Sequence, residues 1–350
     1  MFRILSLFQA AKPVTAVVND TAITVQPKET LLQAALRQGI DFPHSCRVGG
    51  CATCKCRLVE GHVKELTQAG YILSDAELDQ GYILACQSVP RGDVKIAVDL
   101  QSAAARKQVA GRVIGQDKLT HDIVRLRIQL DTTLPYKAGQ FAQLALDGLP
   151  GVARSYSFAT PVQPDAQVSF FVRQVPGGLF SAHVHAQSLI GQSVTVEGPM
   201  GDFWLRPADA PLLMVAGGSG LAPVLALLED ALAAGEQRPV TLFFGARTQA
   251  DLYALDVIAI LAQRWRGRFD FVPVLSQEPE GSSWQGLRGM VVDALAEHQP
   301  PARLRDSHAY LCGPPPMVDG IRAHLLQHGM PGAHIHADRF TTQHDLPVAA

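Results

Sequence analysis

The hydrophobic pattern divides the chain into three successive regions with different predicted structures. In the first, the alternating run VVNDTAITV predicts a hairpin that turns at Asn19 and Asp20, and residues 30–38 predict a helix that Gly39 ends. In the second, short alternating runs between turns predict an antiparallel barrel. Its strands are expected over residues 123–130, 141–146, 168–172 and 193–196. In the third, apolar strands alternate with helices, which is the pattern of a doubly wound α/β domain.

The composition is that of a folded protein with little net charge. Of the 350 residues, 47% are hydrophobic, and 30 Lys and Arg against 32 Asp and Glu give a net charge of −2. This balance argues against nucleic-acid binding as the main activity, and the apolar content excludes a disordered chain. The longest apolar stretch, residues 211–228, is interrupted by glycines, so it predicts a strand, a loop and a helix and no membrane span. Residues 1–12 lack a signal-peptide core and cleavage site, and we expect a cytoplasmic protein.

Five of the six cysteines lie in the first quarter of the chain, and four of them have the spacing of iron–sulfur ligands. Cys46, Cys51 and Cys54 form a Cys-x4-Cys-x2-Cys run, and Cys86 follows after a long gap. This is the plant-type ligand pattern of a [2Fe–2S] cluster. A zinc site is the alternative, because zinc knuckles also use Cys-x2-Cys, but they usually pair it with a second Cys-x2-Cys or with two histidines.

Neighbouring residues fit the iron–sulfur interpretation. Gly49 and Gly50 allow the ligand loop to bend back, so that backbone N–H groups point at the cluster and stabilise its negative charge. Cys56 lies in the alternating run KCRLVEG, which favours a buried thiol on a strand over a fifth ligand. The hairpin, the helix and the loop together predict a β-grasp ferredoxin domain of the α+β class over residues 13–98. A linker over residues 99–107 follows it.

The barrel region, residues 108–207, contains two candidate sites for a phosphate-bearing cofactor. In VARSYSFAT, an arginine on a strand can pair with a phosphate while a tyrosine stacks on a flat heterocycle, although ordinary strand alternation produces the same residue types. Its candidates are Arg154, Ser155, Tyr156 and Ser157. In VRQVPGGLFS, two glycines precede a predicted helix over residues 179–187, so backbone N–H groups at the helix start can bind a phosphate. Its candidates are Val172, Arg173, Gly177, Gly178, Phe180 and Ser181.

The third region, residues 208–340, carries a glycine loop at the carboxyl end of its first strand. The loop GGSG lets a pyrophosphate approach a helix N-terminus, but a proline stands where the pattern G-x-G-x-x-G has its third glycine, so the motif alone is weak. Its candidates are Gly217, Gly218, Ser219, Gly220, Leu221, Ala222 and Pro223. A second strand end reads CGPPPM, which is either a rigid proline turn or a turn that flanks a nicotinamide ring. Its candidates are Cys312, Gly313, Pro314 and Met317.

Together these residues resemble the oxygenase reductases of the ferredoxin–NADP reductase superfamily over essentially the whole chain. The resemblance is carried by GIDFPHSCRVGGCATCK, ARSYSFATP, VRQVPGGLFS, FFGARTQADLYALD, SSWQGLRGMV, YLCGPPPMVD and ADRF. It implies, in chain order, a plant-type [2Fe–2S] domain, an FAD-binding barrel and a nicotinamide-binding domain. The enzyme would pass electrons from NADH to FAD and on to the cluster. Cys46, Cys51, Cys54 and Cys86 would then be the cluster ligands.

The resemblance also implies individual roles around the flavin. Arg154 would hold the FAD pyrophosphate, Tyr156 would stack on the isoalloxazine ring, and Ser157 would hydrogen-bond near flavin N5. Phe340 would cover the flavin face that nicotinamide enters, and Asp338 would lie beside the reacting atoms or would be an ordinary surface carboxylate. The expected group at the reacting atoms is Ser157, Cys312, Asp338 and Phe340. The tail over residues 341–350 departs from the family pattern.

The phosphate and nucleotide sites follow from the same resemblance. Gly178 and Ser181 would hold phosphate, and residues 217–223 with residues 312–317 would hold NADH. Arg247 follows the second strand of the third region, where a 2′-phosphate of NADPH would bind, but the carboxylate of Asp251 lies nearby and would repel it. We therefore expect NADH to be preferred over NADPH.

Within the family, the motifs most resemble reductases of aromatic side-chain monooxygenases. This implies a membrane-embedded non-haem di-iron hydroxylase as electron acceptor. The reductase would be monomeric, cytoplasmic or peripheral at the inner membrane through its partner. A reductase of a soluble ring-hydroxylating dioxygenase is the alternative, and a redox sensor or scaffold without turnover is a candidate of another class. The apolar residues within 1–12 form either a short membrane- or partner-contacting segment or a frayed terminus.

Overall fold

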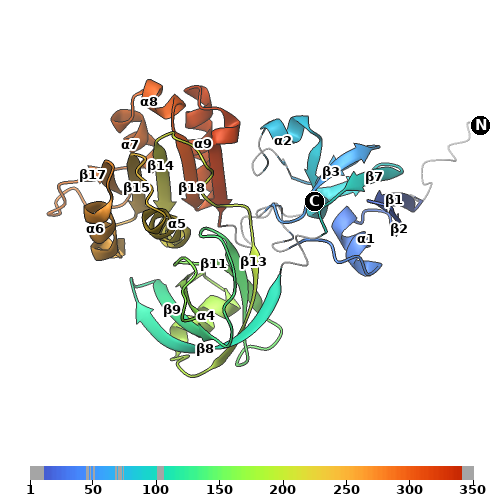
Figure 1. Cartoon of the computed structure of the whole chain (residues 1–350), viewed down its shortest axis with the longest axis horizontal. Helices are drawn as coiled ribbons and strands as arrows, with labels where there is room; N and C mark the ends of the chain where they lie inside the picture. Colours follow the sequence, from blue (N-terminus) through green and yellow to red (C-terminus); the bar gives the residue numbers. More distant parts are fainter. Residues whose placement is uncertain are drawn as a thin grey trace, which may run out of the picture. The chain divides into compact units, whose positions relative to one another are not determined.

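The chain divides into two compact units, Met1–Ala104 and Ala105–Ala350. The structure, a computed structural model, describes residues 12–44, 47, 49, 52–67, 69, 73, 75–100 and 106–340. Figure 1 shows the elements of both units, coloured along the chain.

The first unit is built on a mixed sheet with the strand order β2-β1-β7-β3-β5. Strand β1 runs parallel to β7, and the other neighbours are antiparallel. The strands are β1 (Val14–Val18), β2 (Thr21–Val25), β3 (Lys55–Glu60), β5 (Tyr82–Leu84) and β7 (Val94–Ala97), with a separate pair of β4 (Val63–Glu65) and β6 (Ser88–Pro90). The helices are α1 (Leu31–Arg37), α2 (Asp75–Asp79) and the short 3-10 helix η2 (Ala85–Gln87).

The predicted hairpin and helix of this unit are both confirmed. Asn19 turns the hairpin in the left-handed conformation, with φ 54°, which asparagine tolerates better than most residues. Thr30 and Gln33 form a reciprocal capping box at the start of α1, and Gly39 follows its end with φ +79°.

The second unit begins with an antiparallel sheet of strand order β11-β10-β13-β8-β9-β12, whose outer strands approach each other through a bridge between Phe158 and Phe170. The predicted barrel is therefore confirmed as a nearly closed sheet. Its strands are β8 (Lys107–Lys118), β9 (Ile123–Leu130), β10 (Phe141–Leu146), β11 (Ala153–Ser157), β12 (Gln167–Arg173) and β13 (Ser193–Met200), with helix α4 (Leu179–Ala186).

Strand β8 was not among the predicted strands, and its sequence explains why. Two of its inward positions are glycines, Gly111 and Gly115, which give no apolar signal. A Cβ at Gly111 would lie 2.6 Å from the Gln129 carbonyl oxygen, so close strand packing requires glycine there.

The rest of the second unit is a parallel sheet of strand order β17-β16-β15-β14-β18-β19, which confirms the predicted α/β fold. Its strands are β14 (Leu212–Gly217), β15 (Val240–Ala246), β16 (Phe269–Leu275), β17 (Leu287–Arg288), β18 (His308–Gly313) and β19 (Ile335–Arg339). Its helices are α5 (Leu221–Ala233), α6 (Leu255–Arg264), α7 (Val291–His298), α8 (Pro301–Arg305) and α9 (Pro315–Gln327), with 3-10 turns η3 (Gly218–Gly220), η4 (Gln249–Asp251) and η5 (Gly332–His334).

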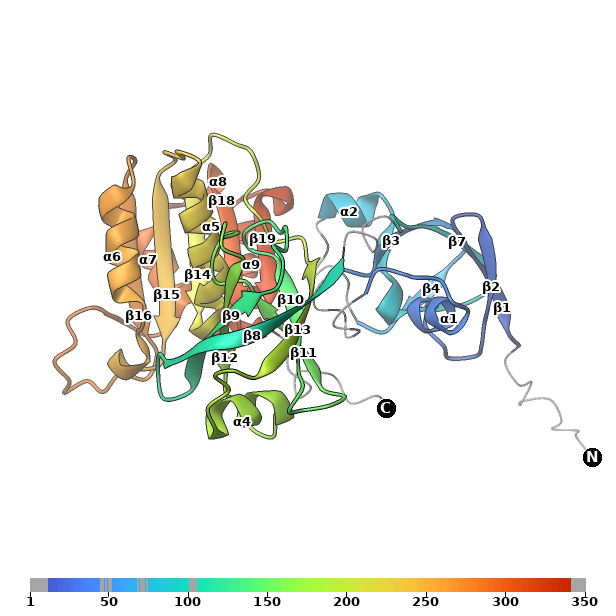
Figure 2. The same ribbon diagram turned by 60° about the horizontal axis from the view of Figure 1, so that its bottom comes forward.

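Helices cover both faces of this parallel sheet, with α5 and α6 on one face and α7 to α9 on the other (Figure 2). Every residue of β14 is buried, with Met214 packed in the α5–α6 core and Val215 in the opposite core. A strand buried on both faces reads as a continuous apolar run, which explains the run LLMVAG.

The strand order reverses between β14 and β18, which lie side by side although about ninety residues separate them in sequence. In open parallel sheets, ligands bind at the carboxyl ends of the strands where this reversal occurs. Gly217 ends β14 and Gly313 ends β18, so both predicted loops of this region meet at that point. Among the described residues, none of the helices is long and apolar enough to cross a bilayer.

Candidate functional site

Two of the four predicted cluster ligands, Cys54 and Cys86, lie within the described residues, and their segments are joined. The Ala85 N–H donates to the Cys54 carbonyl oxygen at 3.0 Å. Both cysteines are buried and neither is part of a disulfide. Two buried thiols on hydrogen-bonded segments fit an iron–sulfur centre, since thiolate sulfur is the soft ligand that such clusters use. Cys46 and Cys51 lie outside the described residues.

The segment that precedes Cys54 in the sequence has unusual backbone conformations. Arg47, Gly49 and Ala52 all have a positive φ, of 58°, 79° and 54°. The two non-glycine residues are held there at a cost of about 1–2 kcal/mol each, and such strain is common at functional loops. The predicted role of Gly50 falls outside the described residues. Cys56 on β3 is buried as predicted, and burial, followed by the charge of Cys86, raises the pKa of its thiol.

Strand β11 places the first barrel motif at an edge of the sheet. Arg154 and Ser155 are exposed, whereas Ser157 is buried. The Arg154 guanidinium donates to its neighbour's carbonyl at 2.8 Å and remains accessible. The Tyr156 ring centroid lies 5.3 Å from that of Phe180, and burial raises the pKa of the phenol, so it stays protonated. An accessible guanidinium beside a neutral aromatic ring fits a phosphate next to a flat heterocycle.

The second barrel motif forms a glycine turn before helix α4, which we call the barrel turn (residues 175–181). Gly177 has φ +70°, and a Cβ there would meet no atom within 4 Å. Gly178 is the N-cap of α4 and offers no side chain to the first helical N–H groups. Ser181 Oγ accepts a hydrogen bond from the Val175 N–H at 3.0 Å and lies 3.3 Å from the Gly178 carbonyl, to which it donates. The hydroxyl therefore holds the turn, and open backbone N–H groups are left for a phosphate.

Two of the candidate residues of this motif have side chains that are buried in the barrel. Val172 is 0% exposed and Phe180 is 1% exposed, and both lie in the barrel core. Their side chains pack beneath the site because β12 and α4 turn these positions inward.

We call the glycine loop after β14 the α/β turn (residues 217–220). The sequence predicts that its glycines make room for a pyrophosphate, but two of them are closely packed against the protein itself. A Cβ at Gly220 would lie 2.4 Å from the Cys312 carbonyl oxygen, and one at Gly217 would lie 2.7 Å from Met317 Sδ. Glycine is therefore required at Gly220 where η3 packs on the backbone end of β18, and at Gly217 it leaves room for the Met317 side chain of α9. Gly218 is the exception, with φ +55° and Arg173 Nη1 3.4 Å from the position of a Cβ. The side chains of Leu221, Ala222 and Pro223 are buried, so only backbone is presented there. Ser219 is also largely buried.

The proline run after β18 begins a helix, which corrects the expectation of a turn. Pro314 is the N-cap of α9, and Pro315 and Pro316 occupy its first turn, where a missing N–H costs nothing. Met317 fills the space between Gly217 and Gly313.

The four residues expected at the reacting atoms converge from three strands. Ser157 Oγ on β11 donates to Asp338 Oδ2 on β19 at 3.2 Å, across 181 residues of sequence. Asp338 stands opposite Cys312 in the parallel pairing of β18 and β19. The Phe340 N–H donates to the Gly313 carbonyl at 2.9 Å. Asp338 is partly buried and accepts this hydrogen bond, which favours a position beside the reacting atoms over that of a surface carboxylate, and the role itself stays a prediction.

The electrostatics of this group keep the thiol neutral. Burial, and then the charge of Asp338, raises the pKa of Cys312 well above its ordinary value. Cys312 is therefore an S–H group beside a carboxylate and not a thiolate nucleophile.

A charged network that the sequence analysis did not identify joins the barrel to the α/β part. Asp122 Oδ2 accepts from Arg173 Nε at 3.1 Å and from Arg247 Nη2 at 2.9 Å. Asp251 accepts from the same Nη2 at 2.9 Å. Burial alone would raise the pKa of Asp122, but the Thr120 hydroxyl and the two guanidinium groups lower it below its usual value. The positive charge of Arg247 is thus offset by two carboxylates, one of them from the barrel.

Tyr253 was also missed, since a tyrosine after a strand carries no distinctive signal. Its hydroxyl donates to the Gly218 carbonyl at 2.8 Å and so stabilises the α/β turn.

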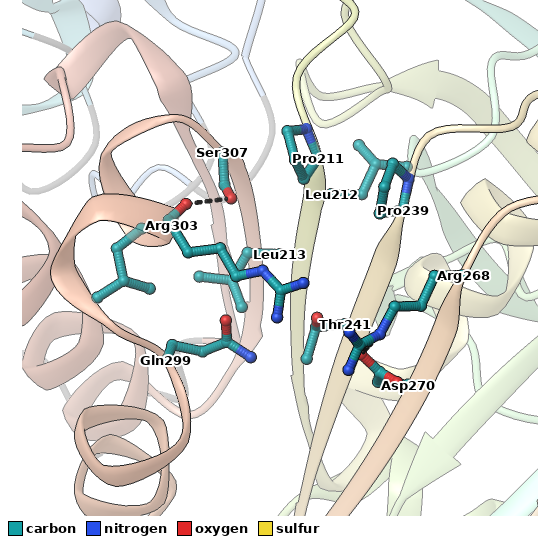
Figure 3. Close-up of a pocket in the computed structure, with 11 residues that line it drawn as sticks. Pro211, Leu212, Leu213, Pro239, Thr241, Arg268, Asp270, Gln299, Arg303 and Ser307 are labelled. Carbon is teal, nitrogen blue, oxygen red and sulfur yellow. Dashed lines mark hydrogen bonds and ion pairs between the residues drawn. The ribbon is translucent and has the colours of Figure 1, made fainter.

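A pocket at the opposite edge of the parallel sheet contains none of the candidate residues (Figure 3). It lies at the amino ends of the strands, as Leu212, Thr241 and Asp270 show by their positions in β14, β15 and β16. Two of the residues that line the pocket are joined by a hydrogen bond, which the Ser307 hydroxyl donates to the Arg303 carbonyl at 2.7 Å.

Models of three protein families match successive parts of the chain. They are the 2Fe-2S iron-sulfur cluster binding domain at residues 16–91, the oxidoreductase FAD-binding domain at residues 110–204 and the oxidoreductase NAD-binding domain at residues 214–323.

Curated relatives and solved structures match nearly the whole chain. The xylene/toluene monooxygenase electron transfer component of Pseudomonas putida is 43% identical over 89% of this chain and 89% of that protein. The reductase component of phenol 2-monooxygenase from Pseudomonas sp. strain CF600 is 38% identical over 95% of each chain. The crystal structure of a cytochrome P450 reductase from Amycolatopsis matches with a TM-score of 0.70 and 32% identity, covering 94% of this chain and 99% of that one.

Proposed function

Because the chain belongs to the family of oxygenase reductase components that combine 2Fe–2S, FAD-binding and NAD-binding domains, we propose that it supplies electrons to a membrane-embedded non-haem di-iron hydroxylase. It is an oxidoreductase that carries electrons from NADH through FAD to a [2Fe–2S] cluster and on to an oxygenase. The proposed hydroxylase acts on aromatic or alkyl side chains, and the 43% identity to the xylene/toluene monooxygenase component supports this substrate class.

The observation that carries the proposed reacting site is the hydrogen bond between Ser157 and Asp338. It joins the FAD-binding barrel to the last strand of the NAD-binding part, beside the buried Cys312. A site that must bring two cofactors together needs residues from both parts at one point, and this contact supplies them.

Each bound group supplies its own chemistry: NADH a hydride, FAD the change from paired to single electrons, and the cluster one-electron transfer. The chain's residues position and insulate these groups. Asp338 orients the Ser157 hydroxyl, and the neutral Cys312 thiol adds no negative charge at the place where the nicotinamide ring would bind. The hydrogen bond of Phe340 to Gly313 fixes the aromatic residue at the end of β19, where it would shield the site from water.

Phosphate binding is assigned to accessible cations and backbone N–H groups. Arg154 and the open N–H groups of the barrel turn would hold the FAD pyrophosphate. Arg173, which extends over Gly218, would hold the NADH pyrophosphate. Ser155 is the exposed neighbour on the same edge strand.

The nucleotide preference is supported by the partners of Arg247. Its guanidinium stays charged but is paired with Asp122 and Asp251, so the net charge of this cluster is not positive and would not attract a 2′-phosphate. We therefore propose that NADH is preferred over NADPH. The ratio of kcat/KM for NADH and NADPH tests this, and a preference for NADPH would contradict it.

The electron path is tested by removing one ligand. Cys54→Ala should abolish cluster assembly but leave NADH-dependent reduction of ferricyanide through the flavin. The control is Cys56→Ala, a buried thiol on the adjacent strand that should retain the cluster. Full-rate electron delivery to cytochrome c by Cys54→Ala would contradict the proposed path.

The type of partner is tested with membranes. We propose that the protein is a monomer that binds peripherally at the inner membrane, through its hydroxylase and residues 1–12. Co-sedimentation with membranes that contain the hydroxylase should fall when residues 1–12 are removed. Equal sedimentation, together with efficient reduction of a soluble dioxygenase, would favour the soluble partner instead.

A further inference from the structure

We propose that Gln87 is a positioning residue for the cluster, which ties the ligand loop to Cys86 and raises the reduction potential. The inference rests on the proposed function, because it takes Cys86 to be a cluster ligand. It adds a residue that the ligand spacing does not identify.

The side-chain amide of Gln87 contacts two parts of the ligand region. Its Nε2 donates to Cys86 Sγ at 3.7 Å and to the Arg47 carbonyl oxygen at 3.3 Å. An amide nitrogen carries two hydrogens, so both bonds can form together. One side chain thus connects the segment of the fourth ligand to the loop that follows Cys46.

Packing holds the Gln87 side chain in this position. Gly49 lies against it, and a Cβ at Gly49 would be 2.8 Å from Gln87 Cγ and 3.0 Å from Thr67 Oγ1. Gly49 also has φ +79°, so both conformation and space require glycine there. The Gln87 carbonyl accepts from the Leu66 N–H at 2.7 Å, which fixes its backbone. The amide is therefore aimed at Cys86 by contacts on several sides.

The expected effect follows from charge. Reduction adds one electron to the cluster and its thiolate ligands, so an N–H donor to a ligand sulfur stabilises the reduced state more than the oxidised state. Cys86 is 5% exposed, and a hydrogen bond in such a low-dielectric environment is stronger than one in water. Removal of the donor should therefore lower the reduction potential.

The test is an EPR-monitored redox titration of the cluster in the full-length holoprotein. Gln87→Met retains the length of the side chain and its contact with Gly49 but removes the donor. We expect its cluster to be reduced at a more negative potential than in the parent. Gln87→Glu should shift the potential further in the same direction, because it also brings a negative charge to the sulfur. The matched control is Gln26→Met, an exposed glutamine at the end of β2, which should leave the potential unchanged.

The outcomes are distinguishable. An unchanged or more positive potential in Gln87→Met, with an intact cluster spectrum, would overturn the role of Gln87. Should Gln87→Met not retain a cluster, the same criterion applies to Gln87→Glu. A parent protein that shows no [2Fe–2S] spectrum at all would instead overturn the proposed function.

Discussion

The barrel turn and the α/β turn look alike in sequence but differ in what surrounds them. Both are glycine pairs that precede a helix, VPGGLF in one and AGGSGL in the other. A Cβ at Gly177 in the barrel turn would meet open space, whereas a Cβ at Gly220 in the α/β turn would collide with the backbone of Cys312. The first turn is held by the Ser181 hydroxyl, and the second is held by an adjoining strand.

The difference shows that a loop can require glycine for two separate physical reasons. In the barrel turn, glycine permits a positive φ and leaves room for a ligand. In the α/β turn, Gly220 permits η3 to pack on the end of β18 and Gly217 leaves room for Met317, so Gly218 is the position proposed to face a ligand. Substitutions in the α/β turn should therefore mainly lower stability, whereas those in the barrel turn should mainly weaken FAD binding.

The largest effect is expected at the α/β turn. Gly220→Ala forces a methyl group against a backbone oxygen that cannot rotate away, and overpacking of this kind should destabilise the second unit by about 3 kcal/mol. Thermal unfolding measures this loss. Gly235→Ala is the control, because Gly235 has φ +78° but open space, so it should cost only the backbone strain of about 1–2 kcal/mol. Equal losses in the two variants would show that the α/β turn is not closely packed.

A smaller effect is expected from the hydroxyl of the barrel turn. Ser181→Ala leaves the partly buried Val175 N–H without its acceptor, which should cost about 1–3 kcal/mol and loosen FAD. Unfolding midpoints and FAD content after gel filtration measure both effects. Ser219→Ala in the α/β turn should have less effect on either, because its hydroxyl makes no hydrogen bond within the part of the chain that the structure describes. The comparison breaks down if Ser219→Ala proves the more damaging change.

Ligand access at the barrel turn is expected to respond to a smaller change. Gly177→Ala adds about 1–2 kcal/mol of backbone strain and a methyl group in the open space assigned to FAD. Gly151→Ala carries the same strain, since Gly151 has φ +77° and open space, so it is the matched control. We expect weaker FAD binding in Gly177→Ala than in Gly151→Ala, measured by fluorescence titration. Equal affinities would show that the open space at Gly177 is not where FAD binds.

The smallest effect is expected from the ion pair of Asp122 with Arg173, which links the two turns. Asp122 holds Arg173, whose guanidinium reaches the α/β turn, and this partly exposed pair should contribute at most about 1 kcal/mol at pH 7. Because the pKa of Asp122 is lowered by folding, its stabilisation is present above the ordinary pKa of about 3.9 and is lost as the pH falls through the lowered value.

Asp122→Asn should therefore be less stable than the parent at pH 7, and the difference should shrink as the pH is lowered below about 4. Unfolding midpoints across this range measure it. A constant difference at every pH would exclude the carboxylate charge as the source.

Much of the fold could be predicted because it is encoded locally. The β14 run and the alternation of β9 and β10 each identify their own element, and the cysteine spacing identifies its own chemistry. Strand β8 was not predicted because its inward glycines remove the apolar signal. Strand β19, which carries Asp338, was not predicted because its side chains are only partly buried.

The sequence by itself determined the three-part order of the chain, the cofactor classes and most of the residues at the candidate site, because ligand spacing and hydrophobic period are properties of short segments. Only the tertiary structure decided which of those residues meet. The contact of Ser157 with Asp338, the pairing of Arg247 with Asp122 and the approach of Gly220 to Cys312 each join residues far apart in the chain. No local pattern encodes such contacts, since they arise where the barrel packs on the parallel sheet and where that sheet reverses its strand order.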